Sequence, residues 1–287
     1  MLITVDIEDH TAPDQGKRFA KAVGPLLESL ALRELRATFF VVGSLAKSWG
    51  CELRELAAHG HEVGVHGYVH RYLRDLGPTA ARDDLARGRD AVGEVLGRLP
   101  AGYRAPYFGL TAETPWAPDL IREVGFLYSS SVLPAWNPQA GIMRAPRLPF
   151  RWSNGLVEFP ARVFGIGPIA VPLLGGAYLR LAPGAVFRLA ARQGIHQQGQ
   201  WTYAHPYDFD VDEPFSRYPG QTALSARLLF ARRRLMLDRI LGIASRSARP
   251  LGDLAADARF VAGLEEFSFE EVTDKRSRAA RQPSTNS

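Results

Sequence analysis

Two histidines four residues apart are the first side chains in this sequence whose type and spacing suggest chemistry. His66 and His70 lie in the run GHEVGVHGYVH, and the strand-like run LITVDIEDH near the start contains the acids Asp6, Glu8 and Asp9. Two imidazoles and one carboxylate are a common ligand set for a hydrolytic Zn²⁺ or similar divalent ion. Three protein ligands leave a coordination position open for water and substrate. We therefore predict a catalytic metal site, with both imidazole rings on one side of a helical turn.

The elements that must position these side chains alternate along the first half of the chain. Short apolar, β-branched runs predict strands, and longer runs with apolar residues at helical spacing predict helices. Strands are expected at 2–7, 37–43, 61–66, 102–109 and 126–132, and helices at 16–35, 44–60 (with Ser44 as N-cap), 78–98 and 114–125. Strand then helix, repeated, is typical of parallel βα units.

The candidate residues share one position relative to these strands. Asp6, His66 and Arg104 each lie at the C-terminal end of a predicted strand or just beyond it. In a barrel of parallel strands that end carries the chemistry. Residues far apart in the sequence are therefore expected to meet.

The second half is less regular. Residues 133–180 break into Pro- and Gly-rich segments that predict long loops and short antiparallel strands, and strand order resumes at GQWTYAHPYDFD, which contains His205 and Pro206. An Arg-rich amphipathic helix is expected at 221–243. We predict a single α/β domain over residues 1–270, with an irregular insertion near 133–180, and a disordered polar tail at 271–287.

Composition excludes several classes of protein. The 287 residues are 46% hydrophobic and 23% charged, as in ordinary globular proteins. The net charge of +5 comes from Arg residues spread over many segments, with no dense basic patch interleaved with aromatics, so no nucleic-acid partner is expected. The single cysteine, Cys51, cannot form an internal disulfide.

The cellular location is predicted from two absences. The start of the chain has neither a basic n-region nor a long apolar h-region, and no run of about 18 apolar residues predicts a transmembrane helix. We expect a cytoplasmic protein. The apolar residues 165–187, interrupted by Pro and Gly, are interpreted as core or groove wall, and peripheral membrane contact stays open as the alternative. The sequence does not indicate an oligomeric state.

A set of ordered motifs resembles a known family. VDIEDH, ATFFVVG, GHEVGVHGYVH, YRAPYFG, FLYSSS and YAHPYDFD occur in the order and approximate spacing of the polysaccharide deacetylases, the NodB homology or carbohydrate esterase family 4. More narrowly, they resemble the branch found in exopolysaccharide gene clusters. The match covers roughly residues 2–215. The resemblance implies a distorted (β/α) barrel, a divalent metal, and hydrolysis of N-acetyl groups on amino sugars.

The resemblance also implies roles for individual residues. Asp6 matches the general base and His205 the general acid. His66 and His70 match the histidine ligands, with Zn²⁺ as the expected metal and Co²⁺ or Ni²⁺ as alternatives. The third ligand matches Glu8 or Asp9; strand alternation puts Glu8 on the same face as Asp6, but a strand that ends earlier would let Asp9 reach the metal.

A second group of matches concerns the substrate side of the site. The R-x-P motif matches Arg104 and Pro106, followed by Tyr107, whose backbone N–H would be an oxyanion donor. Pro106 and Tyr107 are also expected to contact substrate. The sequence departs from the family at Ser129, where relatives carry an Asp that holds the Arg, so Arg104 is expected to lose a charge partner; Asp208 or Asp210 is a candidate replacement.

Three functions follow. The first is metal-dependent removal of N-acetyl groups from an amino-sugar polysaccharide or its lipid-linked precursor, in exopolysaccharide biosynthesis. The second is an amidohydrolase for a small amide, and the third a catalytically impaired, glycan-binding homologue, motivated by Ser129. His10, His59, His61 and His196 are treated as non-catalytic, with His61 expected beneath the metal site. Core packing is expected for Trp136, Trp152 and Trp201, with stacking on sugar rings as the alternative.

Overall fold

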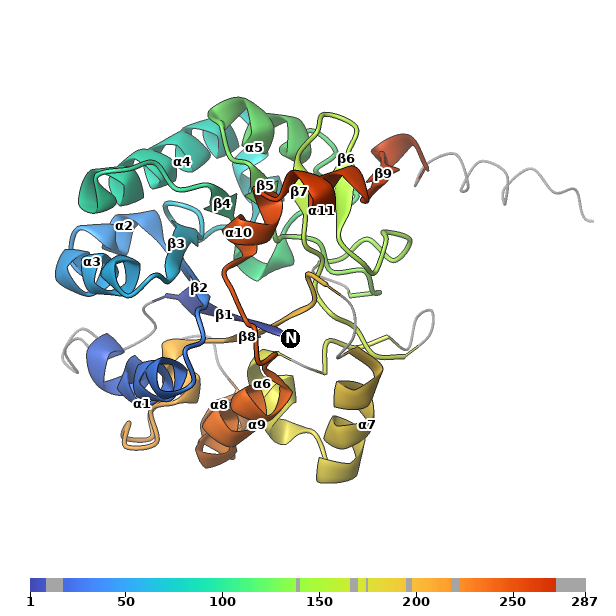
Figure 1. The fold of residues 1–287 in the computed structure, drawn as a ribbon. Helices are drawn as coiled ribbons and strands as arrows, with labels where there is room; N and C mark the ends of the chain where they lie inside the picture. Colours follow the sequence, from blue (N-terminus) through green and yellow to red (C-terminus); the bar gives the residue numbers. More distant parts are fainter. Residues whose placement is uncertain are drawn as a thin grey trace, which may run out of the picture.

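The computed structural model describes residues 1–8, 18–137, 140–165, 170–173, 175–194, 198–217 and 222–271 (Figure 1). Asp9, His10, His196 and residues 272–287 of the tail predicted at 271–287 lie outside these residues. Among the described residues, no helix is both long and apolar enough to cross a lipid bilayer.

One mixed sheet runs through the described residues. Its strands, in spatial order, are β8 (Trp201–Ala204), β1 (Leu2–Ile7), β2 (Thr38–Val41), β3 (Glu62–Val65), β4 (Gly102–Tyr103), β5 (Tyr128–Ser129), β7 (Val157–Glu158), β6 (Phe150–Trp152) and β9 (Glu265–Phe267). Neighbouring strands from β8 to β7 are parallel, and β6 pairs with β7 in the antiparallel sense. The six residues of β1 are all buried, as expected for a central parallel strand with cover on both sides.

Helices connect the parallel strands and form the outer layer of the molecule (Figure 1). They are α1 (Phe19–Leu32), α2 (Gly43–Ala46), α3 (Gly50–Ala58), α4 (Leu73–Leu96), α5 (Ala117–Val124), α6 (Gly176–Leu181), α7 (Gly184–Gly194), α8 (Ala223–Phe230), α9 (Met236–Ile243), α10 (Leu251–Ala255) and α11 (Ala258–Ala262). Short 3-10 turns lie at η2 (Pro106–Phe108), η4 (Pro206–Asp208) and η5 (Arg233–Leu235). This arrangement is the predicted distorted (β/α) barrel.

The sheet is curved, and a side chain spans the inside of the curve. The indole Nε1–H of Trp201, on edge strand β8, donates to the carbonyl oxygen of Phe159, just beyond β7, at 3.0 Å. Both residues are fully buried. This contact brings the two ends of the parallel run of strands together beneath the C-terminal ends of β1 to β5.

Several predicted elements differ in their bounds. The expected helix 44–60 is two helices, and its N-cap is Val42, without a side-chain cap, so the Ser44 prediction is wrong. Helix α4 begins at Leu73, a turn before Pro78, with a non-helical Gly77 at the join. The expected helix 221–243 is divided into α8, η5 and α9, because Arg232 has a left-handed backbone with φ of 56°.

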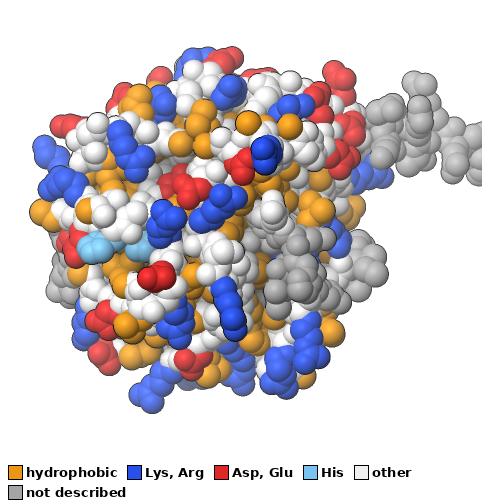
Figure 2. All heavy atoms as spheres, in the orientation of Figure 1, with side chains coloured by type: hydrophobic (Ala, Val, Ile, Leu, Met, Phe, Trp, Pro, Cys, Tyr) orange, Lys and Arg blue, Asp and Glu red, His pale blue; other side chains and the backbone are white. Residues whose placement is uncertain are grey.

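The visible surface agrees with a positive charge that is spread over many segments of the chain. In the view of Figure 2, blue Lys and Arg side chains are interspersed with red Asp and Glu over most of the face. Exposed ion pairs of this kind include Arg82 with Glu123, between α4 and α5.

Candidate active site

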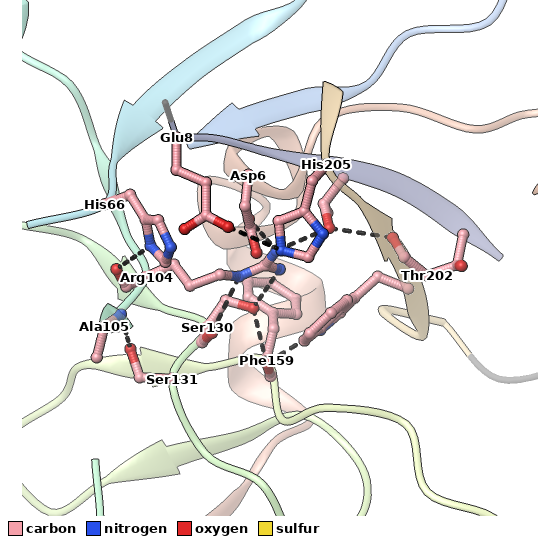
Figure 3. A network of polar contacts seen from close by, with 12 residues as sticks. Asp6, Glu8, His66, Arg104, Ala105, Ser130, Ser131, Phe159, Thr202 and His205 are labelled. Carbon is pink, nitrogen blue, oxygen red and sulfur yellow. Dashed lines mark hydrogen bonds and ion pairs between the residues drawn. The ribbon is translucent and has the colours of Figure 1, made fainter. Parts of the chain in front are cut away.

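The predicted site residues meet at one edge of the sheet. Asp6 and Glu8 lie at the end of β1, His66 directly after β3, Arg104 directly after β4, and His205 directly after β8. Because these strands are parallel, their C-terminal ends lie side by side. Figure 3 shows these five side chains turned toward one another, as the sequence predicted.

Two of these side chains, Glu8 and His66, can hold a metal ion together with His70. Ligand atoms of Glu8, His66 and His70 all lie within 4.8 Å of one another. The Nε2 of His70 is 2.6 Å from an oxygen of Glu8. β1 ends at Ile7, so Glu8 begins the following segment and faces the histidines. The donor set, two imidazoles and a carboxylate, suits Zn²⁺ and similar divalent ions.

The backbone between the two histidines is a loop, so the predicted helical turn is wrong. Residues 66–72 are neither helix nor strand, and His70 has a φ of 51°. Asp84 of α4 holds this loop by accepting hydrogen bonds from the backbone N–H groups of Tyr68 at 2.8 Å and Val69 at 3.0 Å. Gly67 has a φ of 70°, a left-handed conformation that favours glycine. The loop, rather than helical periodicity, brings both rings to one side.

His66 is prepared to act as a ligand. Its Nδ1 lies 2.9 Å from the backbone carbonyl oxygen of Arg104. A carbonyl can only accept, so Nδ1 carries the proton and Nε2 keeps its lone pair. Burial lowers the pKa of His66 to about 4, so the ring is neutral at neutral pH. Metal-bound histidines commonly have this second hydrogen bond to a carbonyl.

Asp6 and Arg104 form a buried ion pair. The Nη1 of Arg104 donates to Oδ1 of Asp6 at 2.6 Å and to the Thr4 hydroxyl at 2.9 Å, and the guanidinium has no exposed surface. The guanidinium also lies between the rings of Phe40 and Trp201, at 4.3 and 4.1 Å from their centroids. These contacts fix both the position and the charge of the guanidinium beside the predicted base.

Ser129 gives Arg104 no charge partner, as expected, but the guanidinium is not left without one. Its partner is Asp6, and the other side of the guanidinium binds Ser130, through the backbone oxygen at 3.2 Å and the hydroxyl at 2.9 Å. The Ser129 hydroxyl instead donates to Ser131, whose hydroxyl oxygen accepts from the N–H of Ala105. Ser129 thus supports the backbone next to Arg104 without contacting its charge.

His205 carries the opposite protonation preference to His66. Burial alone would lower its pKa, but the negative charges of Glu8 and Asp208 raise the pKa to about 9. Its Nδ1 lies 3.1 Å from an oxygen of Asp208, and its Nε2 lies 3.5 Å from Glu8. Two histidines in one cavity with pKa values moved apart are a typical arrangement for separate ligand and acid roles. Glu8 stays ionised, because His205 and His70 lower its pKa against the effect of burial.

Of the two candidate replacements, Asp208 takes the position near the site. It contacts His205, not Arg104. Asp210 points away and pairs with Arg18 at the start of α1, at 2.5 Å.

A cavity of about 430 Å³ opens above these groups. Tyr107 lies on its rim, 47% exposed, and stacks on Tyr72 with ring centroids 4.3 Å apart. Tyr107 has a φ of 59°, and strained backbone of this kind clusters at ligand-binding sites. Pro106 is buried and is not among the residues that line the cavity; a Cβ at Gly67 would come within 3.2 Å of its ring, so the proline lies close to the loop.

Sequence reasoning missed several residues of this site. Tyr72, Asn137 and Tyr178 line the cavity, Thr4 and Ser130 hold Arg104, and Arg180 holds Asp208. Thr4 and Ser130 had a usable signal, since Thr4 adjoins the motif VDIEDH and Ser130 lies within FLYSSS. Tyr178 and Arg180 come from α6, in the insertion whose pattern is irregular.

The structure also places several of the histidine and tryptophan residues that were predicted to lie outside the catalytic group. His61 precedes β3 and therefore lies at the opposite end of that strand from the metal ligands. Its predicted place beneath the metal site is wrong. Its Nδ1 instead accepts a hydrogen bond from the N–H of Ala37 at 3.2 Å. Trp152 and Trp201 are buried in the core, as predicted. Trp136 is 61% exposed, which overturns core packing for this residue.

Comparison with known proteins finds similar sequences over both halves of the chain. Residues 5–126 match the family model described as polysaccharide deacetylase, and residues 130–247 match a domain of unknown function (DUF3473). The chain is 29% identical over 126 residues to a peptidoglycan deacetylase of Helicobacter pylori, which covers 42% of each protein. It is 27% identical over 107 residues to a peptidoglycan deacetylase-like protein of Gibberella zeae, which covers 37% of this chain and 30% of that protein. The chain thus spans less than half the length of these curated relatives.

A solved structure shares the fold over nearly the whole chain. It comes from a Mycobacterium smegmatis protein assigned to the polysaccharide deacetylases, with 22% identity and a TM-score of 0.53, covering 93% of this chain and 92% of that one. This likeness extends through both matched segments, so the second segment is part of the same architecture.

Proposed function

We propose that this chain, a member of the polysaccharide deacetylase family through its residues 5–126, is a metal-dependent hydrolase that removes N-acetyl groups from an amino-sugar glycan. The observation that carries the proposal is the shared cavity. It contains the ligand cluster of Glu8, His66 and His70 together with a carboxylate, Asp6, and an imidazole, His205, whose Nδ1 contacts Asp208.

The metal requirement is supported by the donor set and by the tautomer of His66. Glu8, His66 and His70 would hold the ion, with Zn²⁺ expected and Co²⁺ or Ni²⁺ as alternatives. When bound, a divalent ion supplies Lewis-acid polarisation of the acetyl carbonyl and makes a water molecule more acidic.

The remaining chemistry belongs to side chains of this protein. Amide hydrolysis needs a base for the attacking water and an acid for the departing nitrogen. Asp6, ionised and held by Arg104, accepts the proton of the water. His205, protonated at neutral pH, gives its Nε2 proton to the amine as the C–N bond breaks. The products are acetate and a free amino sugar.

The backbone N–H of Tyr107 is proposed to stabilise the developing oxyanion, and one such donor typically contributes about 3 kcal/mol. The flat faces of Tyr107 and Tyr178, each about half exposed at the cavity, suit the apolar face of a sugar ring. Trp136, which is exposed and precedes Asn137 of the cavity wall in the sequence, is proposed as a further stacking surface for a sugar ring.

The finer parts of the proposal concern the identity of the substrate and the cellular compartment in which it is met. A polysaccharide or its lipid-linked precursor in exopolysaccharide synthesis, met in the cytoplasm, remains our proposed setting. The impaired-homologue alternative loses its motive, because Arg104 has a charge partner in Asp6 despite Ser129. The small-amide alternative is separated from the main proposal by the substrate panel below.

The test is acetate release by the purified protein from N-acetylated oligosaccharides and from small acetamides. The protein is stripped of metal with a chelator and then reloaded with Zn²⁺, Co²⁺ or Ni²⁺. We expect release from oligosaccharides only after reloading. Release from small acetamides alone would favour the amidohydrolase, and no release by a protein with stoichiometric metal would refute both.

A further inference from the structure

We propose that residues 130–247, which match a family model of unknown function, complete the active site. They supply a positioning pair, Asp208 and Arg180, that holds His205 as the acid for the leaving nitrogen. The inference rests on the proposed function and deepens it. Both residues of the pair are fully buried, and both lie outside the segment that matches the deacetylase model.

Asp208 fixes His205 at two points. One carboxylate oxygen accepts from the backbone N–H of His205 at 2.9 Å and lies 3.1 Å from Nδ1 of the ring. An ionised carboxylate can only accept, so Nδ1 carries a proton. The ring is then oriented with Nε2 toward Glu8 and the cavity, as Figure 3 shows for His205. Asp208 also stabilises the imidazolium that the acid role requires.

Arg180 holds Asp208 in turn. Its Nε donates to the other carboxylate oxygen at 2.8 Å, so the two oxygens of Asp208 serve different partners. Its remaining donors bind carbonyl oxygens at the end of α8: Leu228 at 2.8 Å, Leu229 at 2.7 Å and Ala231. The negative end of a helix dipole favours a cation there. A buried charge is stable only with such partners, and here every partner belongs to the second segment.

The pair matters because of the leaving group. An amide nitrogen must be protonated as the C–N bond breaks, since the free amide anion is a very poor leaving group. His205 gives up its Nε2 proton, the electron pair of the broken bond goes to nitrogen, and Asp6 takes the proton of water. An acetyl ester of 4-nitrophenol has a stable phenolate leaving group, so it needs no proton. Loss of a positioned acid should therefore slow amide hydrolysis and spare the activated ester.

The experiment compares these two substrates in the zinc-loaded full chain. Asp208→Asn keeps the shape of the side chain but replaces one carboxylate oxygen with an NH₂ group. Arg180 and His205 both donate to the carboxylate, so the NH₂ group loses the hydrogen bond to one of them. We expect kcat for an N-acetylated oligosaccharide to fall by about 10²-fold or more, with KM and 4-nitrophenyl acetate hydrolysis nearly unchanged. Asp210→Asn is the matched control, because it breaks a similar Asp–Arg contact, with Arg18, away from His205; both activities should persist.

Three results would overturn the proposal. Unchanged amide hydrolysis in Asp208→Asn, or an equal loss on both substrates with metal bound, would remove the positioning role while leaving the proposed function intact. A wild-type protein that hydrolyses neither substrate would refute the function, and the positioning role with it. If Asp208→Asn does not fold, Arg180→Lys is tested instead, because it keeps the charge but loses the planar fork of donors. The same result is required: slower amide hydrolysis with unchanged hydrolysis of the ester.

Discussion

The buried pair of Asp6 and Arg104 should make a large and measurable contribution to stability as well as to activity. Arg104 has no exposed surface, and its partner carboxylate is 4% exposed. Replacing Arg104 with Met keeps the apolar contact with the rings of Phe40 and Trp201 but leaves the charge of Asp6 buried without its ion-pair partner.

The expected size follows from the contacts. Removing one partner of a buried ion pair costs about 3–5 kcal/mol, because the remaining charge stays desolvated. Arg104→Met also removes the donors to Thr4 and to both oxygens of Ser130. We expect the free energy of unfolding to fall by about 3–5 kcal/mol, and by much less in Asp6→Asn/Arg104→Met, where no buried charge remains.

The assay is a double-mutant cycle by urea unfolding at pH 7 in a chelator, so that metal binding does not contribute. Each single substitution leaves one buried charge without its partner, and the double variant leaves none at this pair, so the coupling energy should be at least about 3 kcal/mol. This value lies at or above the top of the range of about 0.5–3 kcal/mol that is typical of groups in contact. Additive effects of the two single substitutions, with a coupling energy near zero, would refute the reasoning. They would mean that water reaches the pair in solution.

Three further predictions follow from the site and its surroundings. His70→Ala should abolish both stoichiometric Zn²⁺ binding, measured by metal analysis after dialysis, and acetate release, whereas exposed His59→Ala should alter neither. Asp6→Asn should lower acetate release by about 10²–10⁴-fold while the metal stays bound, so full activity in this variant would exclude Asp6 as the base. Burial lowers the pKa of His61 to about 4 in the folded protein, compared with about 6.5 in the unfolded chain. The contribution of the neutral ring to folding stability is therefore complete above pH of about 6.5. It is lost as the pH falls from about 6.5 toward 4. In urea unfolding across this range, His61→Asn, which can still accept from Ala37, should lose stability less steeply than the wild type, and equal slopes would contradict the assignment.

Local sequence patterns determined the parallel strands and therefore the meeting point of the site. Short runs that end at or near Asp6, His66 and Arg104 predict strands from a few neighbouring residues, and parallel pairing then puts all their C-terminal ends together. For the same reason the metal ligands and the acid could be identified from ordered motifs. Glu8 could be preferred from strand alternation, and the structure places it in the ligand cluster.

Contacts between distant segments could not be predicted in this way. Whether Arg104 has a partner depends on β1 and β4 lying on either side of β2 and β3, not on the residue at position 129. The conformation between His66 and His70 depends on Asp84, which reaches the loop from α4.

Arg180 is the clearest case. It lies in an irregular insertion, and its role exists only because the end of α8 and Asp208 surround it in the folded chain. Sequence periodicity reports which face of an element is buried, and local motifs report which residues can react. Which buried charges meet is decided by tertiary packing, because a desolvated charge is stable only beside the partners that the whole fold brings to it.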